Sequence, residues 1–151
     1  MDGIRAYWDG QRLSSRKGLV IQVPPNFTLG FPSIPLDGEL WLGRGTLEKM
    51  FAIQNATDGD WSEVKYVLFD LPSSKDPFEI RMDQLKRLNL PSHVSIVEVV
   101  RCEGIQHLKR HLHHVVSSGG EGLMALQPQS LYSVGRTSHL LKVKVYLLFH
   151  P

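Results

Sequence analysis

Apolar and polar residues alternate over short stretches in the first half of the chain. The runs rich in aromatic or β-branched residues are 4–8, 19–23 and 39–42. Glycine, proline and aspartate separate them, as in the segments 9–10, 17–18 and 24–25. Because short alternating runs between such turn residues are typical of β-strands, this half predicts an antiparallel sheet.

Apolar residues at helical spacing then predict three helices. Residues 46–55 form the first, with Thr46 as its N-cap. The second begins at Pro77, which a first helical turn tolerates, and ends before Pro91. Its apolar side is expected from Ile80, Leu85 and Leu88. The third carries an apolar stripe from Ile105 to Val116, and Gly119-Gly120 ends it.

Four further runs complete the pattern as strands, at 64–71, 94–100, 122–126 and 140–148. We find no internal repeat and no linker. The pattern therefore predicts a single α+β unit in which helices pack outside antiparallel strands.

Composition limits the class of protein. The chain has 151 residues, of which 42% are hydrophobic and 21% charged, as in an ordinary globular domain. The net charge of +2 is compatible with a polyanionic partner but does not demonstrate one. No apolar run approaches the ~18 residues that a membrane span needs. A lone cysteine, Cys102, excludes a disulfide framework and favours a reducing, intracellular compartment. We expect its thiol to be partly buried.

Short polar motifs follow one another along the chain, and their residue types suit the handling of a nucleotide. Arg5 can grip a phosphate or ribose in fixed geometry. Ser15-Arg16-Lys17-Gly18 puts a hydroxyl and two cations on one turn. Glu39, after a glycine on a strand, can accept hydrogen bonds from ribose hydroxyls, and Phe69 can stack on a purine.

The last motifs suggest a metal and an anion. Glu121 lies between two glycines, where one carboxylate with substrate phosphates would suit Mg²⁺. Lys142 and Lys144 are two apart on an expected strand and so point to the same face. A same-face lysine pair is costly to bury without an anion. Arg136 stands in Gly135-Arg136-Thr137, between these two motifs.

The order of these motifs resembles the adenylation (nucleotidyltransferase) domain of ATP-dependent DNA ligases. The resemblance covers nearly the whole chain and implies antiparallel β-sheets flanked by helices, of the ATP-grasp-like type. The first motif of that family reads Lys-x-Asp-Gly-x-Arg, and its lysine is the nucleophile. Here the chain opens Met1-Asp2-Gly3-Ile4-Arg5, so the lysine would precede Met1. We therefore expect a partial domain over 1–151, cut at both ends, without the oligonucleotide-binding barrel and inactive in self-adenylation.

The resemblance also assigns roles. It implies nucleotide-binding roles for Asp2, Arg5, Glu39 on ribose and Phe69 on adenine. It implies that Glu121 holds the metal and that Lys142 and Lys144 contact the α-phosphate, as residues taking part in catalysis. Arg16 would hold the 5′-phosphate of a nick and Arg136 a DNA phosphate. The implied activity is nick sealing through enzyme–AMP and DNA–AMP, in DNA repair, replication or recombination. ATP, Mg²⁺ and nicked duplex DNA are the implied partners, and we expect a monomer.

Two other functions stay open at this point. One is a non-enzymatic module that binds a nucleotide or nicked DNA, and the other is a nucleotidyltransferase of the RNA ligase or capping type. His107, His111 and His114 share one helical face, but we expect a solvated polar face rather than a metal site. Trp8, Trp41 and Trp61 are expected in the core or on sheet faces.

Overall fold

A five-stranded sheet forms the larger part of the computed structural model, which describes residues 1–145. The strand order is β2-β1-β3-β4-β5, with bounds β1 Ile4–Trp8, β2 Leu13–Ser14, β3 Leu36–Trp41, β4 Lys65–Asp70 and β5 Val94–Ile96. All neighbouring pairs are antiparallel except β4 and β5, which run parallel. The predicted mixed class is confirmed, with this one parallel pair as a departure from a purely antiparallel sheet.

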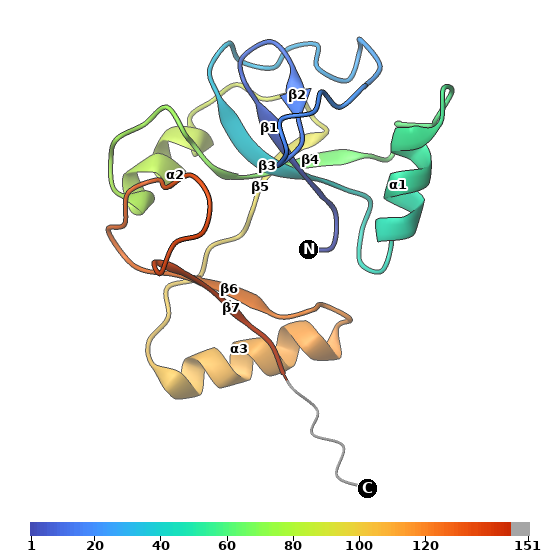
Figure 1. Cartoon of the computed structure of the whole chain (residues 1–151). Helices are drawn as coiled ribbons and strands as arrows, with labels where there is room; N and C mark the ends of the chain where they lie inside the picture. The colour runs from blue at the N-terminus through green and yellow to red at the C-terminus, as the bar shows by residue number, and fades with distance from the viewer. Residues whose placement is uncertain (146–151) are drawn as a thin grey trace, which may run out of the picture.

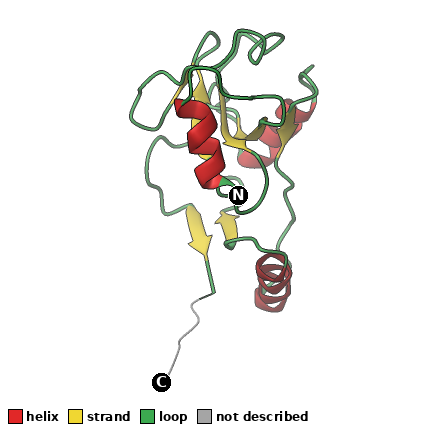
Figure 2. Cartoon of the chain, turned by 90° about the vertical axis from the view of Figure 1, so that its right-hand side faces the viewer, coloured by secondary structure: helices red, strands yellow, loops and turns green. Residues whose placement is uncertain are grey.

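The second sheet is a two-stranded antiparallel hairpin of β6 (Leu123–Leu126) and β7 (Leu140–Val143). Figure 1 shows it below the larger sheet, near helix α3 (Ile105–Ser117), with the N-terminus between the two sheets. In the same view helix α2 (Phe78–Lys86) lies to the left of the larger sheet and helix α1 (Leu47–Asn55) to its right. Met50 of α1 and Met82 and Leu85 of α2 belong to the same hydrophobic core. In Figure 2 the hairpin and α3 form a separate lower layer.

Alternation along the strands divides the larger sheet into a core face and an open face. On the core face, Ala6, Leu40, Tyr66 and Leu68 are all fully buried. The Tyr66 hydroxyl donates to the carbonyl oxygens of Ala6 at 2.9 Å and Leu36 at 3.2 Å. Burial raises the pKa of this hydroxyl far above its usual range, so it remains a donor.

The prediction of a strand at residues 19–23 is wrong. Only an isolated bridge joins Val20 to Ser14, and the side chain of Leu19 is 67% exposed. Pairing cannot continue because Pro24 and Pro25 follow, and proline has no backbone N–H to donate. The strand predicted at 94–100 is also too long. β5 ends at Ile96 because the Val97 N–H makes the last bond, to the carbonyl of Leu68 near the end of β4.

Helix faces differ in detail from the prediction. Ile80, expected on the apolar side of α2, is 46% exposed, and Arg81 takes the inner position beside Met82 and Leu85. Thr46 precedes α1 as predicted, but its hydroxyl donates to the carbonyl of Gly43 at 2.7 Å rather than capping the helix. α3 has the predicted bounds, although none of its residues is fully buried.

Two smaller expectations concern Cys102 and the last strand. Cys102 is exposed, not partly buried, because it lies in the irregular segment before α3. The strand predicted at 140–148 is confirmed for Leu140–Val143, and residues 146–148 lie outside the described part of the chain. Among residues 1–145, no helix combines the length and the apolar composition that crossing a bilayer requires.

Candidate functional site

The open face of the larger sheet carries the first group of predicted site residues. Arg5 pairs across strands with Glu39, and Glu39 with Val67, so their side chains share a face. The register between β3 and β4 then shifts at Asp37 and Gly38, which leaves Phe69 without a strand partner. Such bulges re-aim side chains beside functional sites. The structure thus brings Arg5, Glu39 and Phe69 together.

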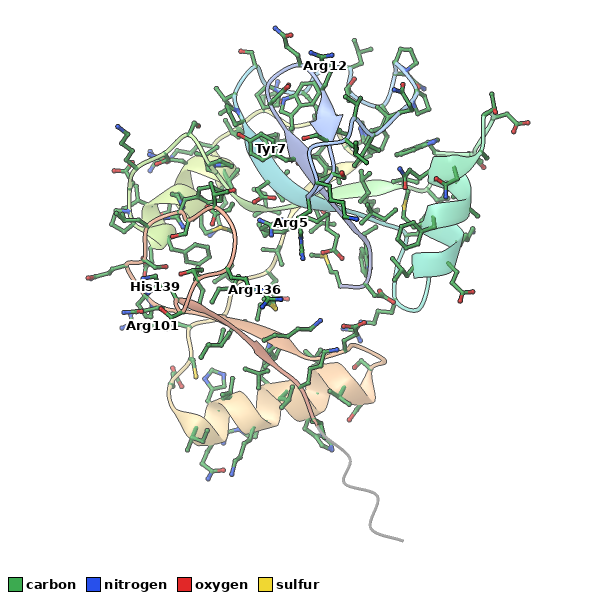
Figure 3. All side chains as sticks on the ribbon, viewed as in Figure 1. Arg5, Tyr7, Arg12, Arg101, Arg136 and His139 are labelled. Atoms are coloured by element: carbon green, nitrogen blue, oxygen red, sulfur yellow. The ribbon has the colours of Figure 1, made fainter. Side chains whose placement is uncertain are left out.

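Arg5 is held by a buried carboxylate. Its Nη2 and Nε donate to the two oxygens of Asp37 at 2.7 and 3.2 Å, in the fork geometry that favours arginine. Asp37 is only 1% exposed. The hydrogen bonds to Asp37 raise the pKa of Arg5. The guanidinium also lies 5.4 Å from the ring centre of Phe69, so β1, β3 and β4 jointly fix its position. Figure 3 shows Arg5 and Tyr7 on β1.

Glu39 is oriented by the backbone of the first motif. The Gly3 N–H donates to its Oε1 at 2.5 Å, and a Cβ on Gly3 would collide with the carboxylate and with the Leu40 carbonyl. The glycine in Met1-Asp2-Gly3-Ile4-Arg5 is therefore needed for close approach rather than for a turn. Among the described residues, Oε2 of Glu39 accepts no hydrogen bond, and it stays available for a ligand hydroxyl.

A second group of predicted residues gathers at the hairpin, and we call it the Glu121 cluster: Glu121, Lys142 and Lys144. Nζ of Lys142 lies 3.1 Å from Oε2 of Glu121, and Nζ of Lys144 lies 3.4 Å from the same oxygen. Both lysines therefore reach one point, as their predicted shared face requires. The Glu121 partnership raises the pKa of Lys142, with a smaller contribution from the charge of Glu39. Glu121 also lines a hollow together with Trp41 of β3, so the cluster lies beside the larger sheet.

A small hollow near the N-terminus lies between the Glu121 cluster and β3. It is lined by Met1, Asp2, Trp41 and Glu121. Asp2 uses its carboxylate to accept hydrogen bonds from the Gly45 N–H at 2.9 Å and from the Trp41 indole at 3.4 Å. In this structure the Asp2 carboxylate therefore holds the loop after β3, and its nucleotide-binding role stays a prediction.

The ion pairs of the Glu121 cluster make a prediction about pH. Hydrogen bonds from Lys142 and then Lys144 lower the pKa of the Glu121 carboxyl from an ordinary value of 4.5. The ion pair therefore contributes stability fully above the unfolded-state pKa and loses it as pH falls through the lower folded-state pKa. An NMR titration of the Glu121 side-chain carboxyl should show this depressed pKa. A Lys142→Ala variant should raise it, a Lys109→Ala variant on α3 should not, and equal titration in all three would contradict the ion pairing.

The two predicted DNA-contacting arginines lie outside these groups. Arg16 is exposed on the turn that follows β2, where the Gly18 N–H donates to the Ser15 carbonyl at 2.9 Å. Arg136 is exposed in the connection between β6 and β7. In the view of Figure 3, Arg5 and Arg136 both lie in the region between the larger sheet and the hairpin. Their contacts to DNA stay predictions.

The carboxylate of Glu121 fits a magnesium site only if substrate phosphates supply further ligands. Within residues 1–145, no three histidine, cysteine, aspartate or glutamate side chains converge as metal ligands. Glu121 offers a single exposed carboxylate, and Mg²⁺ commonly takes one or two carboxylates with waters and substrate phosphates. Among the described residues, His107, His111 and His114 form no such group either.

Sequence reasoning missed the residues that hold Arg5 in place. It assigned no role to Asp37, Tyr132 or Arg81. The Tyr132 hydroxyl donates to Oδ2 of Asp37 at 2.9 Å, across 95 positions of sequence. Local patterns carry no signal for a contact this distant. The burial of Arg81 on α2 could not be predicted either, because a charged residue in an amphipathic helix is normally assigned to the solvent-exposed face.

Comparison with known proteins gives a consistent match. A family model described as "ATP dependent DNA ligase domain" matches residues 33–144. A DNA ligase of Haemophilus influenzae is 32% identical over 148 residues, which cover 95% of this chain and 55% of that protein. The chain thus spans about half the length of this curated relative.

Solved structures agree in fold. One, from a structure–function study of Lig E DNA ligases and their binding of DNA with a minimal scaffold, is 34% identical. It superposes with a TM-score of 0.89 and covers 96% of this chain and 59% of its own. A Chlorella virus DNA ligase–adenylate has a TM-score of 0.76 and 23% identity, covering 95% of this chain and 58% of its own. At that lower identity the likeness concerns the fold alone.

Proposed function

The chain belongs to the ATP-dependent DNA ligase family, and on that premise we propose that it is the nucleotide-binding unit of an enzyme that seals nicks in duplex DNA. In the proposed reaction, a lysine nitrogen attacks the α-phosphorus of ATP and pyrophosphate leaves. The AMP group then passes to the 5′-phosphate of the nick. The 3′-hydroxyl finally attacks that phosphate, which forms the phosphodiester and releases AMP.

One observation carries the proposal most directly. Glu121 lines one hollow together with Met1 and Asp2 of the first motif and with Trp41, which lies on β3 two residues after Glu39. In the family, the nucleophilic lysine directly precedes the residue at the position of Met1. The hollow that Met1 lines also contains Glu121. A nucleophile at that place would stand beside the lysine pair proposed for the α-phosphate.

Each group has a defined task in this proposal. Phe69 offers a ring face to the adenine, and Oε2 of Glu39 accepts from a ribose hydroxyl. Arg5, fixed by Asp37, supplies a rigid cation to the nucleotide. Lys142 and Lys144 neutralise the charge that develops on the α-phosphate.

The lysines must exchange partners when a nucleotide binds. Both now contact the Glu121 carboxylate. A phosphate placed between them competes with that carboxylate and leaves Glu121 able to hold a divalent cation. When bound, Mg²⁺ supplies Lewis-acid stabilisation of the phosphate oxygens.

The test uses the product of the complete gene, incubated with α-labelled ATP and magnesium and then with nicked DNA. We expect a covalent protein–AMP band, its transfer to the 5′-phosphate, and release of AMP as the nick is sealed. An RNA nick run in parallel identifies an RNA ligase or capping-type enzyme if it is sealed preferentially. Absence of covalent label, with ATP and nicked DNA still bound, would replace the proposal with a non-enzymatic binding module.

A further inference from the structure

The connection between β6 and β7 crosses from the hairpin to the larger sheet and is anchored there on α2. The Gln129 N–H donates to both carboxylate oxygens of Glu79 at 3.1 Å. The Ser130 carbonyl accepts from the Phe78 N–H at 3.0 Å and from Nη1 of Arg81 at 2.8 Å. We call residues 129–132 the strap.

Backbone conformation shows that the strap is held in a specific shape. Gln129 has φ +60°, and among the described residues it is the single non-glycine with a positive φ. An L-residue in this region is strained and persists where surrounding contacts determine it. The two bonds to Glu79 and the neighbouring bonds of Ser130 provide those contacts.

Arg81 ties the strap to the sheet. Its side chain is 1% exposed, and its Nε and Nη2 donate to Asp70 at 2.6 and 3.1 Å. Nη1 donates to two carbonyl oxygens, those of Asp76 and Ser130. One buried guanidinium thus joins the end of β4, the start of α2 and the strap.

The strap ends at Tyr132, whose hydroxyl donates to Asp37 beside the Arg5 fork. Asp70, which Arg81 holds, is the strand partner of Asp37. Arg5 gives two of its nitrogens to Asp37, while its Nη1 makes no hydrogen bond among the described residues and its side chain is 37% exposed. The guanidinium is therefore fixed on one side and open on the other.

We infer that Tyr132 is a positioning residue for nucleotide recognition, which acts by holding Asp37 and, through it, the Arg5 guanidinium. Arg81 supports this role because it holds the strap, which positions Tyr132 beside Asp37. The inference rests on the proposed function in that Arg5 is taken to contact the nucleotide. The Tyr132 hydroxyl and Nη2 of Arg5 donate to the same oxygen of Asp37, so this role requires no contact between Tyr132 and the ligand.

A double-mutant cycle on ATP binding tests the inference. Tyr132→Phe removes only the hydroxyl, and Asp37 keeps both Arg5 bonds, so the fold should persist. We expect Tyr132→Phe to weaken ATP binding roughly fivefold to twentyfold. In an Arg5→Lys background, where the fork is already lost, the same change should cost less than about twofold. Ser133→Ala, an exposed neighbour, is the matched control and should leave binding unchanged.

The possible outcomes distinguish a failure of the proposed function from a failure of the inference about Tyr132. An unaltered chain that does not bind ATP overturns the proposed function. A chain that binds ATP but shows additive effects of the two substitutions overturns the inference, because a merely structural tyrosine would act independently of Arg5.

If Arg5→Lys does not fold, NMR of the Arg5 Nε–H provides a second readout in the otherwise unaltered chain. This group donates to Asp37 at 3.2 Å. Tyr132→Phe should speed its exchange with solvent severalfold, and unchanged exchange would overturn the inference.

Discussion

An Arg81→Ala variant is expected to lose about 3–5 kcal/mol of unfolding free energy, the cost typical of removing one partner from a buried ion pair. The substitution leaves the Asp70 carboxylate, which is only 14% exposed, without its cation. It also removes the donor that bonds to the carbonyls of Asp76 and Ser130. Urea denaturation followed by tryptophan fluorescence would measure the loss.

The same helix offers a matched control. Lys86 is 63% exposed, and its Nζ lies 3.9 Å from Asp83 in an i, i+3 pair. Such surface pairs contribute about 0–1 kcal/mol, so Lys86→Ala should be nearly neutral. A loss in Arg81→Ala no larger than in Lys86→Ala would contradict the buried-pair argument.

A further variant asks whether charge or shape matters at this site. Replacing both partners by apolar residues, as in Arg81→Met with Asp70→Leu, should recover a large part of the loss because no buried charge then stands alone. Arg81→Lys keeps the charge but cannot form the fork, so its stability should lie between the native chain and Arg81→Ala. If Arg81→Ala does not fold, the Arg81→Lys measurement still tests the role of the fork.

Two of the open-face residues, Arg5 and Glu39, could be predicted because local periodicity determines their face, whereas the register shift that places Phe69 could not. Two-residue alternation put Arg5 and Glu39 on polar positions of strands whose core positions are buried. The shared face of Lys142 and Lys144 followed from the same period, and the structure confirms that both reach one carboxylate oxygen. Each of these inferences needed only residues within one strand.

Partnerships between distant segments could not be predicted in this way. Glu121 was singled out as a metal ligand, but its pairing with lysines about twenty positions later depends on the hairpin register. Tyr132 reaches Asp37 from the strap, which Arg81 of α2 holds through the Ser130 carbonyl. The error at Ile80 has the same origin, since a buried salt bridge to Asp70 turns Arg81, rather than Ile80, toward the sheet.

Lys142→Ala is expected to weaken ATP binding by roughly 10- to 150-fold, the range that corresponds to a charged hydrogen bond worth about 1.5–3 kcal/mol. In the proposed site this lysine contacts the α-phosphate directly. Isothermal titration with the chain and ATP would measure the change. Lys109→Ala, on the exposed surface of α3, is the control for net charge and should change binding less than about twofold.

Glu121→Gln should have opposite effects with and without magnesium. Because the Glu121 carboxylate now occupies both lysines, removing its charge frees them for phosphate. ATP should therefore bind more tightly to the variant than to the native chain in the presence of a chelator. With magnesium present the order should reverse, since the variant lacks the carboxylate that would hold the cation beside the phosphates. Equal ATP binding by the two proteins under both conditions would contradict the partner exchange. The exchange requires Glu121 to compete with phosphate for the lysines when magnesium is absent and to hold the cation when magnesium is present.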